Sequence, residues 1–219
     1  MLVSDVMSTN VVTIPSHTSL TEARRILDAH HFRRLPVVDR GKLVGIVTKD
    51  ALDKIGFLQP ASLSMHDISY LLSNAPVKEV MQRDVVTVSP SASVEEAVAL
   101  AQTKRVGALV VVEGEKVVGV ATTNDFFYKL LNPLLGIGMP GSRITVRNCY
   151  QGPDVEKVIA AINKLGVKIT ALFTFALTQV EKQGIVVHHD LAVHLATEDS
   201  TRIVKEIQKL GYSVEKIAR

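Results

Sequence analysis

The sequence contains one pattern twice, with a constant shift of 74 residues between the two copies. Met7 of the first copy corresponds to Met81 of the second, and Thr48 corresponds to Thr122, with no gap between these points. Chance matching of abundant residues does not keep one register over such a length, so the pattern indicates an internal duplication. Each copy has too few strands to bury both faces of its sheet. We therefore expect the copies to pack against each other about a pseudo-two-fold axis.

Each copy predicts a strand, a helix, two further strands and a second helix. The first helix begins with a capping box in both copies, Ser19–Glu22 and Ser93–Glu96, which would satisfy free amides at the helix start. The two strands that follow are apolar, β-branched runs joined by a short turn, which is typical of a hairpin. These strands are 35–38 and 43–47 around the turn 39–41, and 108–112 and 117–121 around 113–115.

Composition supports an α/β protein and argues against several other classes. Hydrophobic residues make up 47% of the chain and aromatic residues 5%, with no Trp, so Val, Ile, Leu and Ala carry the packing. The net charge is +3 without a run of five like charges, so no nucleic-acid partner is expected. The single Cys149 cannot form an internal disulfide. Neither a signal peptide nor an apolar run of about 18 residues is present, so we expect a cytoplasmic protein without a membrane partner.

A different pattern follows the second copy. An apolar helical run, 126–135, is expected to stop near Pro133, and the glycine-rich stretch 136–141 indicates a linker. Beyond it the periodicity predicts the order βαββαβ. The expected strands are 143–146, 167–175, 185–195 and 212–217, and the expected helices are 154–165 and 200–210. Between the two copies, the apolar spacing of 65–73 predicts a short connector helix.

These motifs resemble known regulatory families. Leu-Pro-Val-Val-Asp at 35–39 with Gly-Ile-Val-Thr at 45–48 resembles a CBS domain, and the tandem resembles a CBS pair, or Bateman module. The βαββαβ unit resembles an ACT domain, and the whole chain resembles the AcuB-like acetoin-utilisation family. The expected fold class is α/β (α+β), with two CBS domains packed as a pseudo-two-fold pair and a C-terminal ferredoxin-like ACT domain. The expected bounds are 1–58 and 77–134 for the CBS domains, 59–76 for a helical connector, 135–142 for a linker and 143–219 for the ACT domain.

The CBS resemblance implies that adenosine-containing ligands bind in clefts between the copies. In that family a Thr and an Asp after the last strand hold the ribose, and the matching pairs are Thr48 with Asp50 and Thr122 with Asp125. A carboxylate can accept from both cis ribose hydroxyls. The alternative is that the Asp only caps the next helix. The implied nucleotide-binding residues are Thr13, Arg33, Arg34, Leu35, Pro36, Thr48, Asp50, Thr87, Ala108, Leu109, Thr122 and Asp125.

The two sites are expected to be unequal. The shift of 74 places Asp125 on Ala51, so the acid of the first copy, Asp50, stands one residue early. At a helix start, one residue rotates a side chain by about 100°, so we expect the second copy to hold nucleotide more tightly. Arg33 and Arg34 suit a phosphate by their bidentate geometry, which would add affinity in the first copy. They could equally form a solvated helix end.

The ACT resemblance implies an amino-acid site near the first strand–helix loop. The matching residues are Asn148, Tyr150, Gln151, Gly152 and Asp154. The family's Pro-Gly order is reversed here to Gly152-Pro153, and a proline removes an amide donor that a ligand carboxylate would need. We therefore rank this site below the nucleotide site.

Metal binding and catalysis find little support in the sequence. His188, Asp190 and His194 share one face of a strand, but the two histidines would lie roughly 20 Å apart, so no metal site is expected. Cys149 has no partner motif, and neither G-x-S-x-G nor P-loop spacing occurs. We expect an allosteric sensor, not an enzyme, that requires no cofactor and takes adenine nucleotide as its regulatory ligand. Its expected partners are a second copy of the chain and an unidentified regulated protein. The alternative is an interaction scaffold without a ligand.

Overall fold

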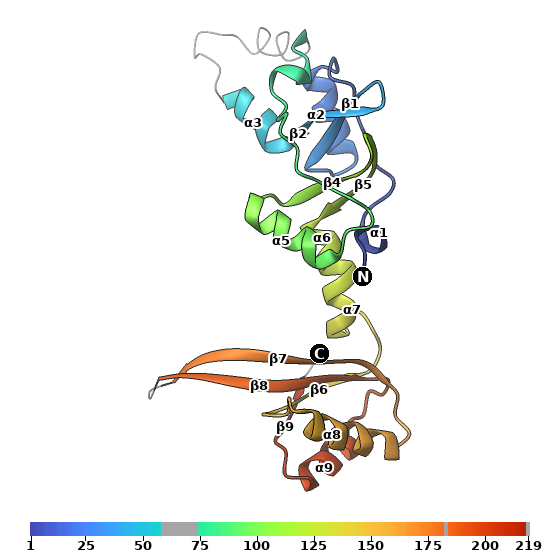
Figure 1. Cartoon of the computed structure of the whole chain (residues 1–219), viewed down its shortest axis with the longest axis vertical. Coiled ribbons are helices and arrows are strands. Elements are labelled where there is room, and N and C mark those ends of the chain that lie inside the picture. The colour runs from blue at the N-terminus through green and yellow to red at the C-terminus, as the bar shows by residue number, and fades with distance from the viewer. Residues whose placement is uncertain (58–73, 182–183, 218–219) are drawn as a thin grey trace. The chain divides into compact units, whose positions relative to one another are not determined.

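The computed structural model describes residues 1–57, 74–181 and 184–217 (Figure 1). The connector helix predicted over 65–73 lies outside these residues. The chain divides into two compact units, Met1–Phe126 and Phe127–Arg219, and each is described by itself. Among the described residues, no helix combines the length and the apolar character that a membrane crossing requires.

The first unit shows the duplication directly. Its first half contains α1 (Val3–Val6), α2 (Leu20–Ala29), β1 (Arg34–Asp39), β2 (Lys42–Thr48) and α3 (Lys49–Phe57). Its second half contains the 3-10 helix Val77–Glu79, β3 (Thr87–Val88), α5 (Val94–Lys104), β4 (Ala108–Glu113), β5 (Lys116–Thr122) and α6 (Thr123–Phe126). The antiparallel β1–β2 pair and the antiparallel β4–β5 pair carry a register shift at equivalent points, Val37/Val38 and Val111/Val112. The internal repeat predicted from the sequence is therefore confirmed down to an irregularity of one residue.

The leading segment of each copy crosses to the sheet of the other copy. Ser8 forms an antiparallel bridge with Val120, and its counterpart Gln82 forms one with Ile46. Just before Ser8, the Met7 side chain packs so closely on Gly119 that a Cβ there would lie 2.5 Å from the Met7 Sδ. The counterpart residues Met81 and Gly45 repeat this packing, with a corresponding distance of 2.6 Å. These paired exchanges relate the copies by a pseudo-two-fold axis, as predicted.

Of the two predicted capping boxes, one is complete in the structure and the other is present only in part. Ser93 and Glu96 form the complete capping box at the start of α5. In the first copy, Ser19 accepts from the Glu22 amide at 3.2 Å, but the Glu22 carboxylate forms an ion pair with Arg25 in the next turn. The second half of the predicted box is therefore absent there, because a cation three residues along the helix competes for the carboxylate.

Each copy buries its own apolar cluster between helix and sheet. The first cluster comprises Ile14, Leu20, Ala23, Leu27, Leu35, Val37, Val47, Leu52, Val77 and Met81, and the second comprises Val3, Val88, Ala97, Leu109, Val111 and Ala121. Val77 and Met81 belong by sequence to the second copy but lie in the core of the first, and Val3 does the reverse. The crossing of the leading segments is thus stabilised by burial of apolar surface.

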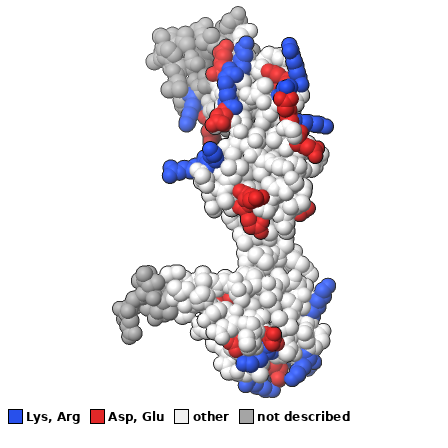
Figure 2. Space-filling model, viewed as in Figure 1, with Lys and Arg blue, Asp and Glu red and all other residues white. Residues whose placement is uncertain are grey.

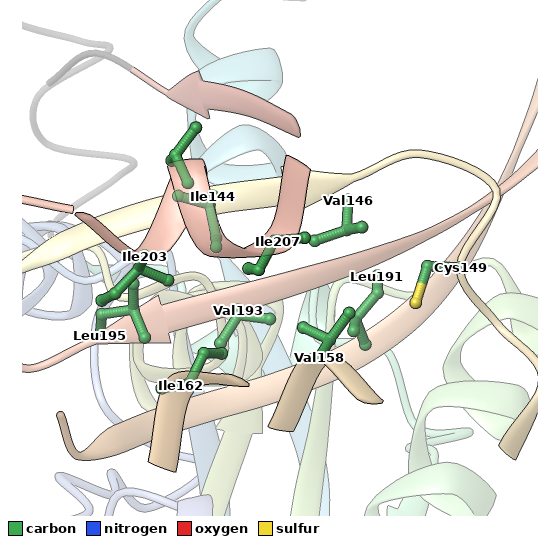
Figure 3. Close-up of a cluster of buried hydrophobic side chains, with 11 residues drawn as sticks. Ile144, Val146, Cys149, Val158, Ile162, Leu191, Val193, Leu195, Ile203 and Ile207 are labelled. Atoms are coloured by element: carbon green, nitrogen blue, oxygen red, sulfur yellow. The ribbon is translucent and has the colours of Figure 1, made fainter. Parts of the chain in front are cut away.

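The second unit has the predicted βαββαβ order. It contains the π-helix Phe127–Leu131, α7 (Asn132–Leu135), β6 (Ser142–Val146), α8 (Gly152–Lys164), β7 (Ile169–Glu181), β8 (Gly184–Leu195), α9 (Thr201–Lys209) and β9 (Val214–Ile217). The four strands form one antiparallel sheet in the order β7-β8-β6-β9, and α8 and α9 lie on one of its faces (Figure 1). The buried side chains between this face and the helices form the core of the unit (Figure 3).

One expectation for this unit needs correction. The helical run predicted over 126–135 does end at Leu135, and Pro133 lies in the first turn of α7, where a proline costs no hydrogen bond. The first strand of the central hairpin does not stop at Phe175 but extends as β7 to Glu181, paired with β8 along its length. No proline or glycine interrupts this run, so nothing in the chain ends the strand earlier.

Candidate ligand-binding cleft

A cleft of about 520 Å³ opens between the two copies in the first unit. Its lining comes from both copies. The first copy contributes Ser8, Asn10, Val11, Val12, His31, Phe32, Arg33, Arg34 and Pro36, and the second contributes Gly107, Val120, Thr122, Thr123, Asn124 and Asp125. The cleft therefore combines one carboxylate, two guanidinium groups and apolar walls in a volume that suits a small molecule.

The carboxylate of Asp125 is fixed at the junction of β5 and α6. Its Oδ2 accepts from the Thr122 hydroxyl at 2.6 Å and from the Thr122 amide at 2.9 Å, while the Asp125 amide donates to Thr122 Oγ1 at 3.3 Å. Its Oδ1 accepts from the Ser8 hydroxyl at 3.0 Å. The capping interpretation of this Thr–Asp pair is therefore realised. It does not compete with a ligand role, because the cap holds the acid in the cleft wall.

The first copy lacks this arrangement. Thr48 Oγ1 accepts from the amide of Ala51 at 3.1 Å, as Thr122 Oγ1 accepts from the amide of Asp125, but Ala51 has no carboxylate. The exposed Asp50 does not replace it at this position, and its charge acts instead on Arg34, whose pKa it raises. The one-residue offset seen in the sequence therefore corresponds to a missing acid at this point of the first copy.

Arg34 is a partly desolvated cation in the cleft. Burial lowers the pKa of its guanidinium, the neighbouring Arg33 lowers it further, and only Asp50 acts in the opposite direction. The guanidinium lies against Gly107, with Nη2 3.5 Å from the position that a Cβ would occupy. Because Gly107 is the counterpart of Arg33, the second copy offers space where the first carries a side chain. Both arginines thus line the cleft that contains Asp125, while Asp50 lies near enough to Arg34 to act on its pKa.

Some of the remaining predicted residues line the cleft, some lie in the core and others lie elsewhere in the unit. Pro36 lines the cleft, whereas Leu35 and Leu109 are fully buried in the two apolar clusters. Five further predicted residues do not line the cleft. Ala108 is buried, Thr13 and Thr87 are exposed, and Thr48 and Asp50 form the pair in the first copy. Sequence reasoning missed several lining residues, namely Ser8, Asn10, Val11, Val12, His31, Phe32, Gly107, Val120, Thr123 and Asn124. The crossing of the leading segments, which brings Ser8 to Asp125, has no local signature.

In the second unit, a buried acid organises the loop between β6 and α8. Asp190 has no exposed surface, and its carboxylate accepts from Arg147 Nη1 at 2.6 Å and from the Asn148 amide at 3.0 Å. Arg147 also contacts Glu215 at 2.5 Å, and the two acids raise the pKa of its guanidinium, Asp190 most strongly. Asn148 adopts a positive φ of 53°, so the chain turns sharply at this point.

The other residues predicted to bind an amino acid lie at the beginning of α8. The exposed Tyr150 ring contacts the His189 ring at a centroid distance of 4.6 Å, and Gln151 precedes the helix as its N-cap residue. Gly152 begins the helix with open space around it. Asp154 accepts from the Tyr212 hydroxyl at 2.6 Å. The predicted residues are adjacent, and the Asn148 amide and the Asp154 carboxylate are already engaged in hydrogen bonds within the unit.

Cys149, His194 and Asp190 were considered as a nucleophile or as metal ligands, and each has a defined environment in the second unit. Burial, and then the nearby Asp154, raise the pKa of the Cys149 thiol, so the thiol stays neutral near pH 7. His194 is buried, and its Nδ1 lies 2.5 Å from the Thr170 hydroxyl, while Asp190 is paired with Arg147. In the described part of the chain, no three His, Cys, Asp or Glu residues come together as a metal site would require.

Comparison with known proteins agrees with this geometry. The CBS domain family model matches residues 3–55 and 77–132, which are the two copies of the duplication. The structure of a putative acetoin utilization protein (AcuB) from Vibrio cholerae is 30% identical, covers 60% of this chain and 91% of its own, and superimposes with a TM-score of 0.52. The chain belongs to the CBS-domain family, and its first unit is a tandem CBS pair.

The curated relatives described next match somewhat more than half of this chain. The protein MJ1225 of Methanocaldococcus jannaschii is 32% identical over 131 residues, which are 57% of this chain and 47% of that protein. An inosine-5'-monophosphate dehydrogenase of Korarchaeum cryptofilum is 32% identical over 125 residues, which are 57% of this chain and 23% of the enzyme. The chain thus spans less than half the length of these relatives. The match therefore does not assign the activities of the whole proteins to this chain.

Proposed function

We propose that the chain is a regulatory sensor that binds an adenine nucleotide in the cleft between its CBS copies. The observation that carries this proposal is the meeting of Asp125 with Arg33 and Arg34 in one cleft. The carboxylate supplies acceptors for the cis hydroxyls of a ribose, and guanidinium groups pair with phosphate in a bidentate manner. The apolar walls, which include Val11, Val12 and Pro36, suit a flat base.

The desolvated Arg34 favours a ligand with a negative charge. A guanidinium whose hydration is reduced, and whose nearest cation is another arginine, gains when an anion enters the site. AMP, ADP and ATP satisfy this requirement, whereas adenosine engages the ribose acceptor alone. We therefore rank the phosphorylated forms above the nucleoside.

Binding would act by allostery and not by catalysis. Because the cleft is lined by both copies, a ligand in it biases their packing and so transmits its presence to the rest of the protein. In this proposal the protein is cytoplasmic, requires no cofactor and regulates a partner in metabolism, in keeping with the likeness to AcuB. An amino acid at the loop 148–154 is a secondary proposal, ranked lower because Pro153 offers no amide to a ligand carboxylate.

A thermal-shift panel tests this proposal. Adenosine, AMP, ADP, ATP and GMP are compared with a set of amino acids on the full chain. We expect the adenine nucleotides to raise the unfolding temperature, by an amount that grows with ligand concentration. An absence of any shift at millimolar nucleotide would favour the alternative, an interaction scaffold without a ligand. Turnover of a ligand that does shift the protein would indicate an enzyme.

A further inference from the structure

The carboxylate of Asp125 already accepts several hydrogen bonds from the chain itself. Its Oδ2 accepts from the hydroxyl and the amide of Thr122, at 2.6 and 2.9 Å, and its Oδ1 accepts from the Ser8 hydroxyl at 3.0 Å. An ionised carboxylate offers about four acceptor positions, two on each oxygen. These three bonds therefore leave at most one position on this carboxylate for a ligand.

The two cis hydroxyls of a ribose need two such positions, so one donor of the chain has to give way when both hydroxyls bind. The two bonds from Thr122 are partly buried and cap the start of α6. The bond from Ser8 is exposed and is the longest of the three. The Ser8 hydroxyl is thus the donor that a ribose can replace at the lowest cost.

The backbone of Ser8 can stay in place when its hydroxyl turns away. The Ser8 amide donates to the Val120 carbonyl at 2.9 Å, and the Val120 amide donates to the Ser8 carbonyl at 3.0 Å. Met7, the residue before, is held by its packing on Gly119. Rotation of one side chain between staggered positions is therefore sufficient to give Asp125 Oδ1 to a ligand. Ser8 lines the cleft, so the displaced hydroxyl remains accessible to water.

The duplication does not repeat this pair of residues. Under the shift of 74 residues, Ser8 corresponds to Gln82 and Asp125 corresponds to Ala51. The side-chain amide of Gln82 donates instead to the Asp84 carbonyl at 3.0 Å. Competition between a hydroxyl of the chain and a hydroxyl of a ligand is therefore specific to the Asp125 carboxylate.

We propose that the Ser8 hydroxyl competes with the ribose of the ligand for Asp125 and so sets the affinity of this cleft. The inference rests on the proposed function. The side-chain link between the copies and a fully bound ribose exclude each other, and such coupling is reciprocal. Loss of the Ser8 hydroxyl should therefore tighten the binding of a ribose. A 2′-deoxyribose, with one hydroxyl in place of the cis pair, uses the remaining acceptor position and should bind with or without Ser8.

Isothermal calorimetry of Ser8→Ala with AMP and 2′-deoxy-AMP tests this competition. We expect AMP to bind the variant about twofold to tenfold more tightly, the range that one net hydrogen bond represents, and 2′-deoxy-AMP to change by less than about twofold. The two nucleotides carry the same phosphate. The contributions of Arg33 and Arg34, and of the interspersed surface charges seen on the first unit in Figure 2, therefore cancel in the ratio of the two affinities.

Two matched variants serve as controls. Ser4→Ala changes an exposed serine of α1 that does not line the cleft and should leave both affinities unchanged. Ser8→Thr keeps the hydroxyl and should restore the affinities of the unmodified chain. A general loosening of the leading segment in Ser8→Ala would alter both nucleotides alike, whereas competition changes only the ratio between them.

The outcomes separate this inference from the proposed function. Weaker binding of AMP to Ser8→Ala would show that Ser8 supports the ligand, and an unchanged ratio of the two affinities would show that it does not compete. Either result would overturn the inference while the proposed function stands. If neither nucleotide bound the unmodified chain, the proposed function would fail, and this inference would fail with it.

Discussion

The Ser8 hydroxyl donates a 3.0 Å hydrogen bond to Asp125 Oδ1, although the two residues stand 117 positions apart in the chain. Ser8 belongs to the first copy of the duplication and Asp125 to the second, so this contact closes the cleft wall across the pseudo-two-fold axis. A ligand that contacts the Asp125 carboxylate therefore senses the relative position of both copies. In the proposed function, this contact couples a bound ligand to the packing of the two copies.

The packing of Met7 on Gly119 should be intolerant of a side chain. In Gly119→Ala the new Cβ would lie 2.5 Å from Met7 Sδ and 3.2 Å from the Ser8 carbonyl oxygen, so the leading segment has to shift. We expect the free energy of unfolding to fall by about 1–3 kcal/mol, the usual cost of overpacking, as measured by urea denaturation. Gly152→Ala is the control, since nothing lies within 4 Å of its Cβ position. Equal stability of the two variants would contradict the crossed arrangement.

Arg34 should distinguish a phosphorylated ligand from a nucleoside. We expect Arg34→Ala to weaken AMP by about tenfold to a hundredfold, which corresponds to about 1.5–3 kcal/mol for a charge-assisted hydrogen bond. Adenosine should bind the variant nearly as it binds the unmodified chain. Isothermal calorimetry measures both constants, with the exposed Arg25→Ala as the matched control. An equal loss for AMP and adenosine would show that Arg34 supports the cleft wall and does not contact phosphate.

Asp190 should be essential to the stability of the second unit. Asp190→Ala removes the partner of Arg147 Nη1 and of the Asn148 amide at once. We expect a loss of about 2 kcal/mol, towards the lower end for charged hydrogen bonds, because Arg147 remains partly in water. Chemical denaturation monitored by circular dichroism would measure it, with Glu215→Gln as the control at the exposed arm of the same network. If Asp190→Ala left the free energy of unfolding unchanged, the loop would be held by its apolar neighbours alone.

Tyr212 should titrate at an unusually high pH. Its hydrogen bond to the Asp154 carboxylate, followed by burial, raises its pKa to about 12, and the same bond lowers the pKa of Asp154. For Tyr212 the stabilising contribution is complete below about pH 10 and is lost as the pH rises through about 12. For Asp154 it is present above the ordinary carboxyl pKa and is lost as the pH falls through the lowered value.

Tyrosinate absorbance measures this titration. Tyr212 is one of four tyrosines, so its late step in an alkaline titration of the folded protein should account for one quarter of the total signal. Tyr212→Phe should remove this late step, and Asp154→Asn should move it towards the ordinary value near 10. A late step that survives Tyr212→Phe would assign the raised pKa to another residue.

The sequence predicted the repeating elements well because their signals are local. The shift of 74 residues, the capping residues Ser19 and Ser93 and the hairpin turns each depend on a few neighbouring positions. The cleft was predicted only in part, because it is assembled by the crossing of leading segments. That Arg33 and Arg34 line the same cleft as Asp125 could not be predicted, since contacts across a pseudo-two-fold axis leave no trace in spacing along the chain.

The length of β7 was underestimated for a related reason. The run beyond Phe175 lacks strict alternation of apolar and polar residues, which is the signal for a strand with one buried face. The structure pairs this run with β8, so backbone hydrogen bonds extend the strand where the side-chain pattern fades. The side chains of residues 176–178 are exposed, so both faces of the strand are open to solvent over these residues.

The central claim is that a nucleotide is held by Asp125 and that the first copy lacks an equivalent acid. Calorimetric titration of Asp125→Ala and Asp50→Ala with adenosine and AMP tests it most directly. We expect Asp125→Ala to weaken both ligands by about tenfold to a hundredfold, or about 1.5–3 kcal/mol, and Asp50→Ala to change adenosine affinity little. A larger loss in Asp50→Ala than in Asp125→Ala would show that the first copy holds the ligand, and would contradict the account.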